Sequence, residues 1–412
     1  MMLKVMSVVL IASACSLNDP FNPTENRQGD ILLPKPPVSE PYRKKLFKPP
    51  LKKVAQNEWP EIWDDLNFKD LDVAIERQLK KFRRFTFEST FKIGSERFPS
   101  QVVPLGLVAI REILKDLNSR NLSKVEFKEA LKQELLDNFN LYTPKDLEQN
   151  QGAFFTGYYT PTMNASLDRT EAFPWGIYKR PENEKLAKST RKQIDFQDKL
   201  VESGYDIFYT DDLFKLYLTH VEGGGRVSYL NSDGQRSFKY LNYNNTNKRT
   251  FRFISKYMIE KGYIDDLSIK SQRRYLDANP QRWEEIYSYS PGYIYFSATD
   301  EPPHGNDGVS LTNARAIATD RKLYKYKGIL AFIQGQRPDR YNEDNQIITE
   351  EFSRFVIDHD TGGAIKGSSR ADIFWGEDDK AEFAAFYTQN RGYLSYLFLK
   401  QERIERWMPL FR

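Results

Sequence analysis

The segment from Asp360 to Gly376 places the strongest constraint on how this chain can fold. The apolar residues 355–357 lead into it and predict a buried strand. Glycines at positions 362, 363 and 367 follow, and glycine lets the backbone turn tightly or pass close to another segment. We therefore expect a buried strand, a glycine-rich loop and a return segment, with an aspartate on each side of the loop.

Asp372 stands directly before three large apolar residues, Ile373, Phe374 and Trp375. A carboxyl group beside apolar side chains is poorly solvated, which raises its pKa and suits a general acid. Asp360 and Asp372 could equally cap turns in a glycine-rich loop. On these residues alone, both interpretations stay open.

The N-terminus has the pattern of a secretory signal peptide. Lys4 precedes a short apolar run at residues 5–11, and small residues follow at 12–14. The apolar run is too short to span a membrane permanently. We therefore expect residues 1–14 to be a signal peptide that is removed.

Cys15, the only cysteine of the chain, follows this pattern directly. It cannot form an internal disulfide, and the segment resembles the site at which bacterial lipoproteins are cut and acylated, with Ala12 where leucine is usual. Lipidation of Cys15 predicts a periplasmic lipoprotein, and Ser16 behind it favours anchoring in the outer membrane. The alternative is a plain secretory signal with an incidental cysteine.

Residues 15–50 have the composition of an extended tether. Eight of the 21 prolines lie between Asp19 and Pro50, and the segment has no periodic pattern.

The formal net charge of +4 comes from 61 basic and 57 acidic residues without a basic stripe, so we expect no nucleic-acid partner. Residues 401–412 are expected to form a tail.

Three amphipathic helices are predicted before residue 140. Asp70 can cap a run with apolar residues at 71, 75 and 79, and a second run has them at 107, 110, 114 and 117. Ser123 and Glu126 form a capping box before a third run. These apolar stripes predict core packing and carry no chemistry.

Residues 154–161, Phe-Phe-Thr-Gly-Tyr-Tyr-Thr-Pro, predict a strand whose backbone approaches another group closely. With further motifs in order, they resemble the membrane-bound lytic transglycosylase A (MltA) family of bacterial cell-wall enzymes. The motifs span most of residues 152–399 and lie at 157–161, 173–174, 177–181, 220–226, 252–262, 267–280, 308–312, 316–320 and 360–376. The last is the strongest and resembles a C-terminal region of the three-aspartate (3D) type.

Two stretches depart from the family pattern. Residues 244–249 read Asn-Asn-Thr-Asn-Lys-Arg where the family has a turn rich in Gly, Asn and His. Residues 324–328 lack the family's Ile-Pro-Leu-Gly. Both departures concern expected substrate contacts and leave the segment from Asp360 to Gly376 unchanged.

The resemblance implies a mainly β fold with added helices. A double-psi β-barrel domain, catalytic and carrying the N-terminal helices, would combine residues 51–163 with 289–400. A second, smaller β-barrel domain for substrate binding would be inserted at 164–288, with a groove between the two. The sequence itself shows short aromatic and β-branched runs between turns at 164–250 and a more helical pattern at 251–288.

The resemblance also implies an activity: cleavage of the β-1,4 bond between N-acetylmuramic acid and N-acetylglucosamine in peptidoglycan, with formation of 1,6-anhydro-N-acetylmuramic acid. Most glycosidases need two carboxyl groups. A lytic transglycosylase can work with one, because the C6 hydroxyl of the substrate itself attacks. Alignment of the motif places this general acid/base on Asp372. Asp360 is the second catalytic candidate, as a loop organiser or an electrostatic support.

Substrate-binding candidates lie near these aspartates in the motifs. Tyr158, Tyr159 and Trp375 could stack on sugar rings or belong to the core. Lys366 and Arg370 could orient acetamido or lactyl-peptide groups or be solvated loop charges. The residues expected to bind substrate are Gly157, Tyr158, Tyr159, Thr160, Gly225, Arg226, Lys366, Arg370 and Trp375.

Two other functions stay open. Asp360-Thr361-Gly362 is the loop sequence of an aspartic protease, but that mechanism needs two aspartates sharing a proton, so a dimer would be required. A non-catalytic peptidoglycan-binding lipoprotein would keep the groove without turnover. We expect neither metal nor cofactor, because three histidines and one acylated cysteine do not make a zinc site. The expected partners are peptidoglycan glycan strands and the membrane, through Cys15, for a monomeric protein.

Overall fold

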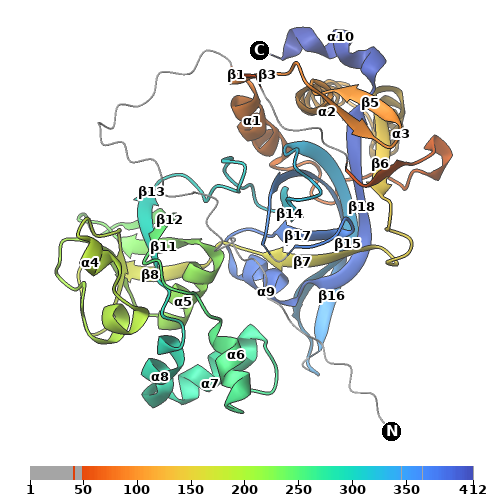
Figure 1. Cartoon of the computed structure of the whole chain (residues 1–412). Helices are drawn as coiled ribbons and strands as arrows, with labels where there is room; N and C mark the ends of the chain where they lie inside the picture. The colour runs from red at the N-terminus through yellow and green to blue at the C-terminus, as the bar shows by residue number, and fades with distance from the viewer. Residues whose placement is uncertain (1–39, 42–48, 345, 364, 412) are drawn as a thin grey trace. The chain divides into compact units, whose positions relative to one another are not determined.

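The computed structural model describes residues 40–41, 49–344, 346–363 and 365–411 (Figure 1). These residues form two compact units. The barrel unit holds residues up to 158 together with 304–376 and 383–411, and the inserted unit holds residues 159–303 and 377–382. Residues 159–163 and 289–303, which the sequence assigned to the first domain, thus fall in the inserted unit.

The barrel unit is built on one closed sheet. Its strands are β2 (Leu51–Lys53), β6 (Phe139–Pro144), β7 (Ala153–Tyr158), β14 (Ala316–Thr319), β15 (Ile329–Tyr341), β16 (Ile347–Asp360), β17 (Arg370–Phe374) and β18 (Gln389–Leu399). They pair in the order β15-β16-β14-β17-β7-β18-β6-β2, and a further pairing of β15 with β18 closes six of them into a barrel. Two of the pairings, β14–β16 and β17–β7, are parallel.

The barrel unit also contains helices and short strands outside the eight-stranded sheet. They are β1 (Glu40–Pro41), α1 (Leu71–Phe82), β3 (Phe85–Thr86), β4 (Thr90–Ile93), β5 (Glu96–Pro99), α2 (Val102–Ser119), α3 (Lys124–Asn138) and α10 (Ile404–Trp407). Figure 1 shows α1, α2, α3 and α10 at one end of the unit. The predicted tail thus includes α10, in which Trp407 is buried and donates its indole N–H to Asn138.

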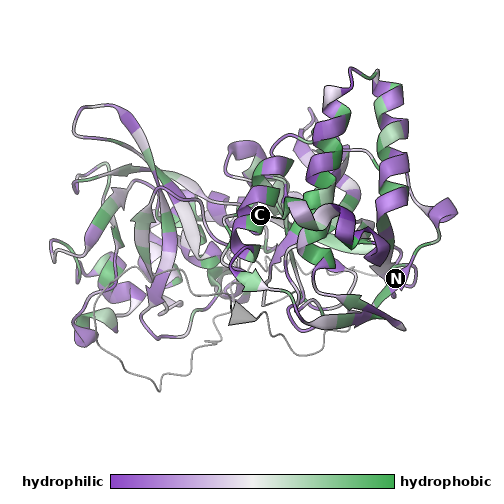
Figure 2. Cartoon of the chain, turned by 90° about the horizontal axis from the view of Figure 1, so that it is seen from above, coloured by the Kyte–Doolittle hydropathy of each residue, from purple (hydrophilic) through white to green (hydrophobic). Residues whose placement is uncertain are grey.

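The three predicted helices are present. The capping box of α3 is confirmed, since Ser123 accepts from the Glu126 backbone N–H and Glu126 from the Ser123 N–H. Asp70, however, precedes α1 in the left-handed conformation with φ of 60° and its side chain caps nothing. Figure 2 shows hydrophilic and hydrophobic residues on different sides of the helices, and the apolar side of α2 packs on β15 and β18.

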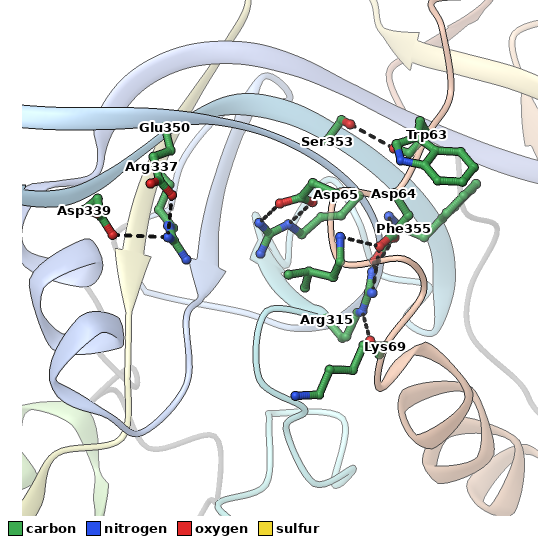
Figure 3. A network of polar contacts seen from close by, with 12 residues as sticks. Trp63, Asp64, Asp65, Lys69, Arg315, Arg337, Asp339, Glu350, Ser353 and Phe355 are labelled. Atoms are coloured by element: carbon green, nitrogen blue, oxygen red, sulfur yellow. Dashed lines mark hydrogen bonds and ion pairs between the residues drawn. The ribbon is translucent and has the colours of Figure 1, made fainter. Parts of the chain in front are cut away.

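A buried ion pair ties the N-terminal part of the unit to the strands of the barrel (Figure 3). Arg315, directly before β14, binds Asp64 through both terminal nitrogens at 2.5 and 2.9 Å, with both side chains fully buried. Arg315 also donates to the carbonyls of Lys69 and Phe355, and Asp64 accepts from the Phe355 N–H. Breaking such a pair costs about 3–5 kcal/mol, so β14 and β16 are firmly placed.

The inserted unit has a six-stranded sheet and several helices. Its elements are β8 (Thr162–Ser166), β9 (Trp175–Tyr178), α4 (Glu184–Ala187), β10 (Asp206–Thr210), α5 (Leu213–Glu222), β11 (Gly224–Leu230), β12 (Arg236–Thr246), α6 (Ile254–Glu260), α7 (Ile269–Ala278), α8 (Trp283–Ser288) and β13 (Ile294–Thr299). The strand order is β13-β12-β11-β8-β10-β9, and β13 and β9 also contact each other. The sheet is therefore barrel-like, and the helical pattern predicted at 251–288 is confirmed. Helix α9 (Asp379–Tyr387) contains residues of both units.

The signal peptide at 1–14, Cys15 and most of the tether predicted at 15–50 lie outside the described residues. None of the helices in the described parts of the chain is long and apolar enough to cross a membrane.

Candidate active site

Strand register in the barrel unit brings the two predicted aspartates to the same level. Ala318 of β14 pairs with Asp360 of β16 on one side and with Asp372 of β17 on the other. One strand, β14, therefore lies between the two backbones, and neighbouring strands lie about 4.8 Å apart. Twelve positions apart in sequence, the aspartates become near neighbours across a single alanine.

A register shift in β16 separates Asp360 from the aspartate two positions before it. The consecutive residues Ile317 and Ala318 of β14 face Asp358 and Asp360, so one extra residue, His359, is accommodated there. A bulge of this kind re-aims side chains. Asp358 consequently points into the core, where Lys327 binds it at 2.7 Å and Thr319 donates to it. Asp360 instead accepts a hydrogen bond from the Tyr158 hydroxyl.

Asp372 is buried, with 2 % of its surface exposed, and its neighbours bind one oxygen only. Its Oδ1 accepts from the Thr156 hydroxyl, and Arg370 lies 3.4 Å from the same oxygen. Arg370 also donates to the Thr156 hydroxyl at 3.0 Å. Among the described residues, Oδ2 of Asp372 has no hydrogen-bond partner. Burial raises the pKa of Asp372 to about 6, against the lowering effects of Arg370 and Thr156.

Asp360 has a different environment at the end of β16. Its Oδ1 accepts from the backbone N–H groups of Asn306 and Thr361, both at 2.7 Å, and its Oδ2 accepts from the Tyr158 hydroxyl at 2.9 Å. Burial raises the pKa of Asp360, while these three donors oppose the rise. A carboxylate that accepts three hydrogen bonds is suited to stay ionised.

Polar side chains outside the segment from Asp360 to Gly376 hold the loop between the aspartates. Asp320, after β14, accepts from the Gly367 N–H at 3.0 Å, where Gly367 has φ of 100° and so requires glycine. Asp146 accepts from the hydroxyls of Ser368 and Ser369. Lys366 is exposed, and no ion pair or hydrogen bond engages it among the described residues.

The three aromatic residues expected to stack on sugars are buried. Tyr158, Tyr159 and Trp375 have 8, 3 and 6 % of their surfaces exposed. The Tyr158 ring packs against Phe374, and the Trp375 indole donates to the Thr388 hydroxyl. Burial of this degree favours the core interpretation of these three residues over stacking on sugars.

The predicted glycines serve internal packing. A Cβ at Gly157 would lie 2.5 Å from the Trp375 indole nitrogen, and one at Gly225 would lie 2.7 Å from the Thr219 side chain. Both distances are shorter than real Cβ contacts, so the neighbours account for the missing side chains. Thr160 is likewise buried, with 3 % exposed.

Arg226 belongs to a polar cluster in the inserted unit. Its guanidinium binds Glu377 at 2.9 Å and lies 4.1 Å from the centre of the Phe238 ring. Tyr240 donates to the same carboxylate at 3.0 Å. Arg226 lines a pocket of about 400 Å³. The pocket is also lined by Thr162, Met163, Asn164, Asp211, Asp212, Lys215, Glu377, Asp378 and Asp379.

The sequence reasoning missed Thr156, Asn306 and Glu377. Thr156 lies in the predicted strand of residues 154–161, directly opposite Asp372 in the β7–β17 register, so a correct strand pairing would have found it. The other two are distant in sequence from their partners and carry no local signal. Within the described parts of the chain, no group of three or more His, Cys, Asp or Glu side chains could hold a metal ion.

Family models match two parts of the chain. The MltA specific insert domain matches residues 154–297 and the 3D domain matches residues 315–397, together more than half of the 412 residues. The chain belongs to the MltA family. The matched insert, 154–297, extends beyond the predicted 164–288 at both ends, and this membership replaces the aspartic protease alternative.

Named relatives of this MltA-family chain are similar over much of its length. A membrane-bound lytic murein transglycosylase A homolog of Buchnera aphidicola is 24% identical over 347 residues, covering 82% of this chain and 89% of that protein. Membrane-bound lytic murein transglycosylase A of Escherichia coli K12 is 24% identical over 242 residues, covering 58% and 63%.

Solved structures share the fold. Escherichia coli MltA with bound chitohexaose aligns with a TM-score of 0.63 and 19% identity over 87% of this chain and 97% of that one. A membrane-bound lytic murein transglycosylase of Agrobacterium tumefaciens gives a TM-score of 0.60 and 21% identity over 87% and 99%. The predicted fold class, a double-psi barrel domain with an inserted barrel domain, is confirmed.

Proposed function

We propose that this member of the lytic transglycosylases cleaves peptidoglycan glycan strands between N-acetylmuramic acid and N-acetylglucosamine, with Asp372 as the single general acid/base. The observation that carries the proposal is that the two oxygens of Asp372 have different hydrogen-bond partners. Thr156 and Arg370 engage Oδ1, while Oδ2 has no partner among the described residues. Oδ2 can therefore hold the proton and pass it to a substrate.

The proposed reaction needs no second protein nucleophile. Asp372 donates its proton to the glycosidic oxygen as the C1–O bond breaks, and the leaving N-acetylglucosamine takes that proton. The C6 hydroxyl of N-acetylmuramic acid then attacks C1, and its proton returns to Asp372. Intramolecular delivery replaces a positioned water and lowers the barrier by several kcal/mol. The product is 1,6-anhydro-N-acetylmuramic acid, and no water is consumed.

Asp360 would act as an electrostatic support in this scheme. Its three donors favour the ionised form, and an anion one strand away from Asp372 stabilises the positive charge that develops at C1. The same anion favours the protonated form of Asp372. Arg370, Lys366 and Arg226 stay proposals as substrate contacts, with Arg226 lining the pocket in the inserted unit.

Purified sacculi provide the test. Products released by the protein, identified by mass spectrometry, should carry anhydro ends and be lost in the Asp372→Asn variant. Reducing ends would indicate a hydrolase that positions a water. Binding to sacculi without release would support the non-catalytic lipoprotein.

A separate proposal concerns location, because the relatives are named membrane-bound. We propose that Cys15 carries a lipid anchor facing the periplasm. The wild type should sediment with outer membranes and need detergent for release, whereas Cys15→Ser should be soluble or uncleaved with unchanged intrinsic turnover. A wild-type protein that fractionates as soluble without detergent would contradict the proposal.

A further inference from the structure

A short closed loop, residues 304–310, lies where the chain re-enters the barrel unit after the insertion. Gly305 donates to the Val309 carbonyl at 2.9 Å and Gly308 to the Gly305 carbonyl at 2.8 Å. His304 and Ser310 form an isolated β-bridge across its base. The loop therefore has its own hydrogen-bonded structure.

This loop touches the candidate site through the backbone. The N–H of Asn306 donates to Asp360 at 2.7 Å, and a Cβ at Gly305 would lie 3.1 Å from the Asp360 carboxyl carbon. Tyr158, the last residue before the insertion, donates to the other oxygen of Asp360. Asp360 thus binds the chain just before and just after the insertion.

Helix α1 clamps the loop through Asp307. Lys81 binds the Asp307 carboxylate at 2.5 Å and also its carbonyl oxygen, and Gln78 donates to the carboxylate at 3.3 Å. The Asp307 side chain is 6 % exposed. The next residue back, Asn306, is the one that donates to Asp360. A movement of Asp307 would therefore move the Asn306 N–H directly.

We propose that Lys81 and Asp307 are positioning residues for turnover. They hold the loop 304–310 so that the Asn306 N–H stays on Asp360, and Asp360 in turn keeps its charge and place beside Asp372. This inference rests on the proposed function, in which Asp360 supports the reaction at Asp372. Neither Lys81 nor Asp307 lies among the residues that the family motifs pointed to.

The test compares three substitutions, two at Lys81 in α1 and one at Arg83, directly after α1. Lys81→Met removes the clamp and leaves the buried Asp307 carboxylate without its cation. Lys81→Arg restores the charge. Arg83→Met is the matched control, because Arg83, the C-cap residue of α1, forms an ion pair of similar length, 2.6 Å, with Glu76 of α1, away from the loop.

Two measurements are made on each full-length protein. Turnover of soluble glycan strands gives kcat and KM, and hydrogen–deuterium exchange by mass spectrometry reports on the peptide covering 304–310. In Lys81→Met we expect kcat to fall about tenfold to a hundredfold with little change in KM, because a displacement of about 1 Å can cost that much. Exchange in 304–310 should rise. Lys81→Arg should recover both values, and Arg83→Met should change neither.

The outcomes separate this inference from the proposed function. If hydrogen–deuterium exchange in 304–310 is unchanged in Lys81→Met, Lys81 does not hold the loop. Faster exchange with unchanged kcat would overturn the positioning role. A wild type that releases no anhydro product would contradict the proposed function instead, and exchange in 304–310 would still decide whether Lys81 holds the loop.

Discussion

The two aspartates at the ends of the glycine-rich loop are chemically identical and have opposite surroundings. Asp372 lies within β17, between β14 and β7, and side chains of Thr156 and Arg370 bind one of its oxygens. Asp360 lies at the last position of β16, where two backbone N–H groups and the Tyr158 hydroxyl bind both of its oxygens. Asp372, inside its strand, thus keeps one oxygen without a partner among the described residues, whereas both oxygens of Asp360, at its strand end, accept hydrogen bonds.

The difference explains how two neighbouring carboxyl groups can have separate roles. Burial raises the pKa of both, but only Asp360 receives three donors that favour its charged form. Pairs of titratable groups whose environments push them apart are typical of acid and base assignments. Asp372 is accordingly the proton carrier of our proposal and Asp360 the fixed anion.

Substituting Asp372 tests its role as the proton carrier, and we expect this substitution to have the largest effect on turnover. Asp372→Asn keeps the shape of the side chain and removes the transferable proton. Loss of general acid catalysis costs about 10²–10⁴-fold, and we expect the upper end, because the scheme has no other acid. Release of anhydro-muropeptides from sacculi measures the loss. Near-normal release by this variant, with none from Asp360→Asn, would reverse the two roles.

Substituting Asp360 should have a smaller effect on turnover and a distinct effect on stability. Asp360→Asn replaces charge-assisted hydrogen bonds by neutral ones, a loss of about 1 kcal/mol. We expect turnover to fall about tenfold to a hundredfold and the midpoint of thermal unfolding to drop. If turnover falls while the thermal midpoint and exchange in 304–310 stay as in the wild type, Asp360 does not organise the loop.

Local patterns predicted the strand before Asp360, the desolvation of Asp372 and the capping box of α3. Each depends on residues within a few positions of one another. The surroundings of the aspartates depend instead on strand pairings and loops far away in sequence, such as Thr156 opposite Asp372 and Asn306 against Asp360. Such contacts arise from tertiary packing, which leaves no periodicity to detect.

The points that stayed open or differed have the same origin. An exposed Tyr158 or Trp375 and a buried one look alike in sequence, and contacts with residues distant in sequence, such as Phe374 and Phe352, accompany their burial. Asp70 has the residue type of a helix cap, but its backbone is left-handed and its side chain makes no cap hydrogen bond. Gly157 likewise indicated a close approach, and the group that lies close to it is the Trp375 side chain.

The pH dependence of turnover sharpens the contrast further. With a pKa of about 6, protonated Asp372 becomes scarce as the pH rises, so turnover should fall about tenfold between pH 5 and pH 7. A rate that is flat across this range, measured with soluble glycan strands, would contradict the assignment of Asp372 as the general acid.

The same pKa shift predicts a stability effect. A carboxyl group whose pKa is raised from 3.8 to about 6 in the folded state stabilises the protein fully below pH 3.8, and this contribution disappears as the pH rises through about 6. The loss is on the order of 3 kcal/mol. Asp372→Asn should therefore unfold at a higher temperature than the wild type at pH 8, and the advantage should vanish near pH 4.

The smallest effect is expected from the side chain that anchors Asp372. Thr156→Val removes the hydroxyl that donates to Oδ1 and keeps the size of the side chain. Since that hydrogen bond lowers the pKa of Asp372, its loss should raise the pKa and move the fall in turnover to higher pH, with a change in turnover of about three- to tenfold.

Thr319→Val is the matched control, because the Thr319 hydroxyl donates to the buried Asp358 in the same barrel. That variant should lose thermal stability, and its turnover should fall over the same pH range as in the wild type. An equal shift of this pH range in both variants would show that the pH profile reports on folding. A shift in Thr156→Val alone would show that the titrating group is Asp372.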